Sequence, residues 1–181
     1  EASRDSVITP QAEPLMRELE EQGVDVKLDK KFAELRARLL AIDTSVVDLP
    51  ANFQAELRPY QHEGFQWLCR LEAWGVGGIL ADDMGLGKTV QTLAMLVRRA
   101  ALGPALVIVP TSLSTNWLRE ASRFAPTLRV VDWRLQRDIS TLGAGDVLLA
   151  TYGLVTTSAA ELQRHKFATL IIDEAQHIKN P

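Results

Sequence analysis

The sequence feature that most limits the fold is a series of short apolar runs that do not alternate with polar residues. The runs cover residues 78–81, 105–109, 128–131, 147–150 and 169–172. Continuous runs of this length are typical of strands buried on both faces of a sheet. Segments with helical spacing of apolar residues separate them, which favours a parallel sheet. We therefore predict an α/β fold in which helices cover both faces of a mostly parallel sheet, in three layers.

Helices are expected at four places around these strands. Pro59 is a favoured first-turn residue, and the helix that it opens is expected to end near Trp74. The other three are expected over about 88–100, 112–124 and 154–163. All of them belong to one continuous lobe, which we place at residues 55–181.

Residues 1–54 have a different pattern. A helix is expected to begin at Thr9 and Pro10 and to end at Gly23. A short strand over 24–28 and a second helix, capped by Asp29, should follow. Nothing in this segment suggests chemistry, so we predict a small, mainly helical accessory region.

Composition restricts the classes of partner. The formal net charge is −3, so any contact with nucleic acid must come from a local patch. No stretch reaches the roughly 18 apolar residues of a membrane span, and we expect no membrane partner. The single cysteine, Cys69, has apolar neighbours and is expected in the core. One cysteine also suits a reducing compartment, so a cytoplasmic location is predicted.

A glycine-rich segment between a predicted strand and a predicted helix has the pattern of a phosphate loop. It reads Asp-Asp-Met-Gly-Leu-Gly-Lys-Thr over residues 82–89. Glycines allow successive backbone N–H groups to point inward, and the helix that follows adds a partial positive charge. Lys88 adds a full charge for the outer phosphates, and the Thr89 hydroxyl can bind Mg²⁺. The first glycine of the usual pattern is replaced by Asp82, so the motif alone is ambiguous.

Two adjacent carboxylates, Asp173 and Glu174, follow the predicted strand at 169–172. In open α/β sheets, ligands bind at the carboxyl ends of the strands. There Asp173 can hold Mg²⁺ and Glu174 can polarise an attacking water. This acidic pair and the phosphate loop together predict a magnesium-nucleotide site.

Five segments in one order resemble the first RecA-like lobe of the Swi/Snf-type remodelling and repair ATPases, within the DEAD-like helicase superfamily. These segments are 57–61, 82–89, 109–117, 150–152 and 173–180. The resemblance is strongest to bacterial members and covers about residues 55–181. It implies ATP hydrolysis, with Mg²⁺, coupled to translocation on double-stranded DNA. Asp82 agrees with this family's own form of the phosphate loop.

Matched residue by residue, the resemblance assigns Gln61 to the adenine, with Arg58 and Tyr60 beside it, and Gln176 to sensing of the γ-phosphate. The catalytic residues that it implies are Lys88, Asp173 and Glu174, and the Mg²⁺ ligands are Thr89 and Asp173. The nucleotide-binding set is Arg58, Tyr60, Gln61, Asp82, Met84, Gly85, Leu86, Gly87, Lys88, Thr89 and Gln176. The residues implied to line the DNA track are Thr111, Ser112, Asn116 and Thr151. Hydroxyl and amide side chains suit contacts with phosphates, which hold register without reading sequence.

Several expectations remain open at this point. Trp117 is expected to be a core residue, because it is spaced with Phe124 along a helix. The chain does not begin with Met and ends after a charged motif, so we expect a piece of a longer protein whose second lobe carries the arginine fingers. This piece alone should bind Mg-ATP and hydrolyse it near background. Protein partners from transcription or repair are possible. A DEAD-like RNA helicase lobe and a non-catalytic nucleotide-binding scaffold are the alternatives.

Overall fold

The computed structural model describes residues 22, 23, 30, 34, 46–83 and 85–178. The helices and the strand expected before residue 46 lie almost entirely outside the described residues. Met84 in the phosphate loop lies outside them as well. The chain divides into two compact units, one formed by Glu1–Val47 and Gln66–Ile79 and the other by Asp48–Phe65 and Leu80–Pro181. The predicted accessory region at 1–54 stays a prediction.

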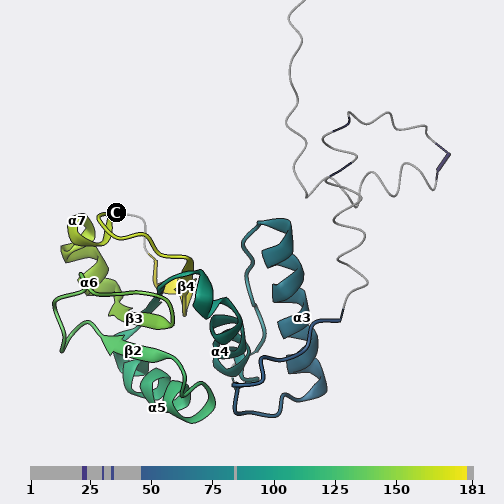
Figure 1. Cartoon of the computed structure of the whole chain (residues 1–181), viewed down its shortest axis with the longest axis horizontal. Helices are drawn as coiled ribbons and strands as arrows, with labels where there is room; N and C mark the ends of the chain where they lie inside the picture. The colour runs from purple at the N-terminus through teal and green to yellow at the C-terminus, as the bar shows by residue number, and fades with distance from the viewer. Residues whose placement is uncertain (1–21, 24–29, 31–33, 35–45, 84, 179–181) are drawn as a thin grey trace, which may run out of the picture. The chain divides into compact units, whose positions relative to one another are not determined.

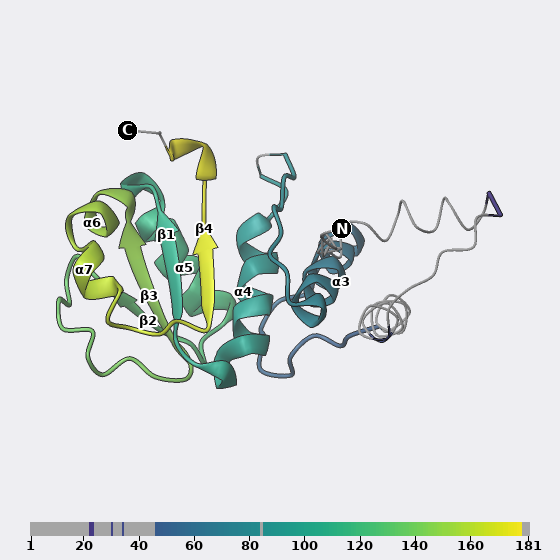
Figure 2. The same cartoon turned by 90° about the horizontal axis from the view of Figure 1, so that it is seen from above.

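The second unit contains a four-stranded sheet in which all strands are parallel. The strands are β1 (Ala105–Val109), β2 (Arg129–Asp132), β3 (Asp146–Thr151) and β4 (Thr169–Ile172), in the order β2-β3-β1-β4 (Figure 2). Ala105 aligns with Val147 of β3 on one side and with Thr169 of β4 on the other. Four of the five predicted strands are therefore present, within two residues of the expected bounds.

The four predicted helical regions are also present. The helices are α3 (Pro59–Trp74), α4 (Lys88–Arg99), α5 (Ser114–Phe124), α6 (Tyr152–Thr157) and α7 (Ala159–Leu162). The region expected as one helix over 154–163 is two, because Ser158 leaves the helical conformation at φ −123° and ψ 26°. Short 3₁₀ turns, Ala100–Leu102, Thr111–Leu113 and Ala175–His177, add to these helices.

The core lies on both faces of the sheet, as the apolar runs predict. Every residue of β1 and β3 is buried. On one face, Leu106, Ile108 and Leu148 pack with Leu162 of α7. Because side chains alternate along a strand, Val107 points to the opposite face, where α5 lies (Figure 1). The three-layer α/β prediction is confirmed.

The prediction of a buried strand at 78–81 is wrong. Ile79 is 85% exposed, and the segment pairs with none of the four strands in the described part of the chain. A Cβ atom at Gly78 would lie 2.2 Å from Cδ1 of Leu71, so the segment instead packs closely along α3. Apolarity alone cannot distinguish a run that pairs in a sheet from one that returns along a helix.

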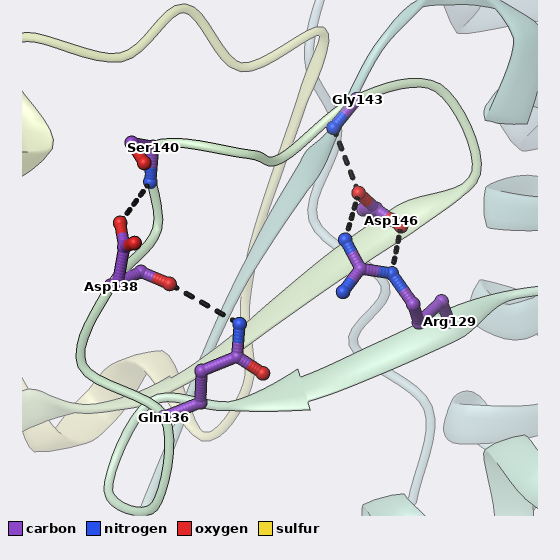
Figure 3. Close-up of polar contacts among 6 residues, drawn as sticks. All are labelled: Arg129, Gln136, Asp138, Ser140, Gly143 and Asp146. Carbon is purple, nitrogen blue, oxygen red and sulfur yellow. Dashed lines mark hydrogen bonds and ion pairs between the residues drawn. The ribbon is translucent and has the colours of Figure 1, made fainter.

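The connection between β2 and β3 is fixed by polar contacts (Figure 3). Nε and Nη2 of Arg129 donate to the two carboxylate oxygens of Asp146 at 2.7 and 2.6 Å. The backbone N–H of Gly143 also donates to Asp146. Farther along the loop, the Asp138 carboxylate accepts from the Ser140 N–H, and its carbonyl accepts from Gln136. The Arg129–Asp146 pair joins the first residues of two neighbouring strands and secures their register.

Candidate nucleotide-binding site

The direction of helix α4 decides where the phosphate loop lies. Arg99, in its last turn, donates from Nε to the Thr169 hydroxyl and from Nη2 to the Ala168 carbonyl, both at 2.8 Å. The end of α4 therefore lies beside the start of β4, and the two elements run in opposite directions (Figure 2). Lys88 at the start of α4 and Asp173 after β4 consequently lie at the same end of the sheet, its carboxyl end.

The phosphate loop bends through two glycines in the left-handed conformation. Gly85 has φ 82° and Gly87 has φ 80°. Gly87 directly precedes α4 and caps it without any side-chain hydrogen bond. The positive φ of Gly87 favours glycine there, and a Cβ atom, 2.4 Å from Nε2 of Gln61, would displace the Gln61 amide. The first-turn N–H groups of α4 thus follow a tight bend, as an anion-binding loop needs.

Lys88 turns back onto its own loop. Its Nζ donates to the carbonyls of Asp82 and Asp83 at 2.7 and 3.1 Å. Thr89, half-buried, follows it in the first turn of α4. An ammonium group and a hydroxyl at a helix start are the groups that suit a nucleotide phosphate and its Mg²⁺.

Gln61 lies against the phosphate loop and is only 9% exposed. Its Nε2 donates to the Leu86 carbonyl at 3.0 Å, and its Oε1 accepts from the Arg58 N–H at 3.0 Å. The Arg58 and Tyr60 side chains are exposed beside it. These contacts place the residues expected to bind adenine next to the loop, while adenine recognition itself stays a prediction.

Gln91 is a residue of this site that the sequence analysis missed. It is fully buried on α4, and its Nε2 lies 3.3 Å from Oδ2 of Asp82 and 3.5 Å from the Gly87 carbonyl. Its Oε1 faces Gly64 of α3, where a Cβ atom would lie only 2.0 Å away. A glutamine among buried apolar positions of an amphipathic helix was the available signal. Gln91 ties the first residue of the phosphate loop to the helix behind it.

The acidic pair is held by several hydrogen bonds. The Asp173 N–H donates to the Ile108 carbonyl, which extends the pairing of β1 and β4. Oδ1 of Asp173 accepts from the Glu174 N–H at 3.0 Å, and Oδ2 accepts from Nε1 of Trp117 at 2.8 Å. Trp117 is 3% exposed, so its predicted core position is confirmed, but its link to Asp173 was not foreseen.

Glu174 has an unusual backbone conformation. At φ 51° and ψ 51° it is left-handed, a strained region for a residue with a Cβ atom. The Tyr152 hydroxyl donates to the Asp173 carbonyl at 2.6 Å and lies 3.2 Å from the Glu174 carbonyl. Burial, and then the charges of Asp173 and Glu174, raise the pKa of Tyr152, so its hydroxyl stays protonated as a donor. The Gln176 side chain donates to the Glu174 carboxylate.

The residues expected to line the DNA track differ in accessibility. Thr111 and Ser112 are exposed in the 3₁₀ turn before α5. The Asn116 amide donates to Glu120 at 2.7 Å and accepts from Arg119 at 2.6 Å. Thr151 is only 8% exposed, and its hydroxyl caps α6 by accepting from the Leu154 N–H at 3.4 Å. Their roles stay predictions.

Two further findings bear on the class of protein. Among the described residues, no three His, Cys, Asp or Glu side chains gather closely enough to hold a metal ion. None of the described helices has the length and apolarity needed to cross a membrane.

Comparisons with known proteins agree with this geometry. Helicase SWR1 from Mycosarcoma maydis is 41% identical over 143 residues, which cover 72% of this chain and 8% of that protein. The ISWI chromatin-remodeling complex ATPase CHR11 from Arabidopsis thaliana is 36% identical over 150 residues, covering 76% of this chain and 14% of that protein. These relatives are eukaryotic, so the resemblance to bacterial members in particular stays a prediction.

Solved structures give the same result. The Sulfolobus solfataricus SWI2/SNF2 ATPase core in complex with dsDNA matches with a TM-score of 0.67 and 41% identity. The match covers 76% of this chain and 30% of that one. The model of the SNF2-related domain matches residues 60–181, more than half of the sequence. The chain therefore belongs to the family of SNF2-related domains, with the helicase-like ATPases as its relatives.

Proposed function

We propose that this chain is the ATP-binding lobe of a motor that couples ATP hydrolysis to translocation on double-stranded DNA. The observation that carries the proposal is the shared position of the phosphate loop and the acidic pair at the carboxyl end of the sheet. α4 runs opposite to β4, so Lys88 and Asp173 face the same end. The solved relative described as bound to dsDNA supports DNA as the partner.

In this proposal each group has a distinct task at the nucleotide. Lys88 exchanges the carbonyls of Asp82 and Asp83 for the outer phosphates, and the bend at Gly85 and Gly87 directs N–H groups at the same charge. Thr89 and Asp173 would hold Mg²⁺, which would neutralise phosphate charge. Gln61, with Arg58 and Tyr60, contacts the adenine. The other loop residues, Asp82, Met84 and Leu86, shape the pocket.

Glu174 orients the attacking water and accepts its proton. Its carboxylate receives a hydrogen bond from Gln176, which therefore suits the proposed sensing of the γ-phosphate. On the DNA side, Thr111, Ser112, Asn116 and Thr151 bind phosphates without reading bases. Exposure of Thr111 and Ser112 supports their part of this assignment.

The proposed activity belongs to a larger protein. The chain spans 8% and 14% of the two curated relatives above. Rapid turnover requires the arginine fingers of a second lobe, which contribute on the order of 10³ to 10⁵ in rate. The name of one relative above includes a remodelling complex, which suggests that the intact protein has protein partners. That these partners belong to the transcription or repair machinery stays a prediction. A cytoplasmic location likewise stays a prediction.

Nucleotide titration of the chain tests the site. Lys88→Ala should weaken binding of Mg-ATP at least about 10-fold, because hydrogen bonds to charged groups are worth about 1.5–3 kcal/mol each. Lys166→Ala is the control, since Lys166 is an exposed lysine just before β4. Equal binding by wild type and Lys88→Ala would remove the assigned site.

The nucleic-acid partner is tested with the intact protein. ATP hydrolysis is measured with duplex DNA, single-stranded DNA and single-stranded RNA side by side. Stimulation by the duplex supports the proposal. Stimulation by RNA alone would identify an RNA helicase instead, and tight nucleotide binding without hydrolysis would identify a scaffold.

A further inference from the structure

Each of two segments proposed to contact DNA is followed at once by an aromatic residue with a polar tip. Asn116 precedes Trp117 in α5, and Thr151 precedes Tyr152 at the start of α6. Both aromatic side chains donate hydrogen bonds to the acidic pair, Trp117 to a side chain and Tyr152 to backbone carbonyls. Two elements that are far apart in sequence therefore both reach Asp173, and α6 also reaches Glu174.

Trp117 acts on the side chain of Asp173. Its indole N–H donates to Oδ2 at 2.8 Å, while Oδ1 accepts from the Glu174 N–H at 3.0 Å. With both oxygens engaged, the carboxylate has one preferred orientation. The indole is 3% exposed, so water does not compete for this hydrogen bond.

Tyr152 acts on the backbone of the pair. Its hydroxyl contacts the carbonyls of both Asp173 and Glu174, at 2.6 and 3.2 Å. The peptide between them leads into the left-handed conformation of Glu174, which neighbouring contacts must stabilise. Tyr152 is thus placed to hold the turn that directs the Glu174 side chain.

We propose that Trp117 and Tyr152 are positioning residues that link the DNA-contacting segments to Asp173 and Glu174, and that DNA stimulates ATP hydrolysis partly through them. The inference rests on the proposed function. A shift of α5 at Asn116, or of the start of α6 at Thr151, moves the adjacent aromatic tip and thereby the acidic pair. Neither aromatic residue needs to touch the nucleotide.

The intact protein carrying Trp117→Phe or Tyr152→Phe tests this. Each change removes one hydrogen-bonding group and keeps a ring in place. Trp133→Phe is a matched control, because Trp133 is 0% exposed and its indole N–H donates elsewhere, to the Arg137 carbonyl at 3.4 Å. The readouts are kcat and KM for ATP with and without saturating duplex DNA, and the Mg²⁺ concentration for half-maximal rate.

Trp117→Phe should lose about 10-fold in DNA-stimulated kcat, the lower end of what a hydrogen bond to a charged group is worth. Tyr152→Phe should lose about fivefold, because its hydroxyl donates to neutral backbone carbonyls. KM for ATP should stay within about twofold, because the proposal places neither residue in contact with the nucleotide. The ratio of stimulated to unstimulated rate should fall about threefold or more, and the Mg²⁺ requirement of Trp117→Phe should rise. Trp133→Phe should keep the wild-type ratio.

The outcomes separate the two proposals. If the wild type is stimulated by DNA and both variants keep its ratio, the inference is wrong and the proposed function stands. If all three variants lose the ratio equally, packing alone explains the loss and the inference is also wrong. If the wild type shows no stimulation, the proposed function fails and the inference with it. Should Trp117→Phe fold poorly by circular dichroism, Tyr152→Phe alone decides, since Tyr152 is only partly buried.

Discussion

Replacing Gly64 with alanine should destabilise the protein, although the same change favours most helices. Within a helix, alanine is better than glycine by about 0.5–1 kcal/mol. In α3, however, the new Cβ atom would lie 2.0 Å from Oε1 and 3.1 Å from Cδ of Gln91. The first distance is about 1.4 Å short of the 3.4 Å at which ordinary contact begins.

Gln91 can relieve this overlap only by giving up its present place. It is fully buried, and moving it would break its contact with the Asp82 carboxylate. Overpacking of this kind costs about 1–3 kcal/mol. After subtraction of the gain in helix propensity, we expect Gly64→Ala to lower the free energy of unfolding by up to about 2.5 kcal/mol, with a central value of about 1 kcal/mol.

A double-mutant cycle by urea unfolding isolates the cause. In a Gln91→Ala background the overlap is gone, so Gly64→Ala should be stabilising by about 0.5–1 kcal/mol. Gly153→Ala is the control, because a Cβ atom at Gly153 in α6 meets nothing within 4 Å. If Gly64→Ala stabilises the wild type as much as Gly153→Ala does, the argument from Gln91 is refuted.

Two further predictions concern the phosphate loop and the sheet. Gly87→Ala should destabilise the protein by about 1–2 kcal/mol, because φ is 80° and the new Cβ atom would overlap with the Gln61 side chain. The same variant should also bind Mg-ATP more weakly than the wild type, measured in the titration used for Lys88→Ala. Unchanged affinity would contradict the role of the bend. The Arg129 side chain, against some opposition from burial, holds the pKa of Asp146 below its usual value. The stability that Asp146 contributes is therefore present above the unfolded-state pKa of about 3.9 and is lost as pH falls through the lower folded value. Asp146→Asn should accordingly be less stable than the wild type at pH 7, with the difference shrinking in urea unfolding at pH 3; a constant difference would exclude this ion pair as the cause.

Most of the fold followed from periodicity alone. Strands β1 and β4 begin and end where the apolar runs do, and α3 begins at Pro59, because burial and helix-start preferences are local properties of the sequence. The segment at 78–81 shows the limit, since pairing is not local. Strand β4 shows a second limit of periodicity. Its continuous apolar run predicts full burial, but Leu170 and Ile172 are 57% and 39% exposed in the described part of the chain.

The candidate site also has features that the sequence predicted and features that it did not. The placement of the glycine-rich loop before α4 and of the acidic pair after β4 was predictable from residue types and order, while their binding of a nucleotide stays a proposal. Gln91, and the hydrogen bonds of Trp117 and Tyr152, were not predictable. These hydrogen bonds join residues that are distant in sequence. Gln91 and Asp82 are nine positions apart, and Trp117 and Asp173 are 56 positions apart. No period or motif in one sequence reports such contacts.

The left-handed conformation of Glu174 has a consequence for protein engineering. Glycine adopts φ 51° without the penalty that a Cβ atom brings, so replacement of Glu174 by glycine would relieve backbone strain and delete the carboxylate. A selection for heat resistance alone would then enrich variants that lack the carboxylate to which we assign activation of water. Under the proposed function, thermostable versions of the domain should be sought with residue 174 held fixed, because a single substitution there would raise stability and remove the proposed catalytic group.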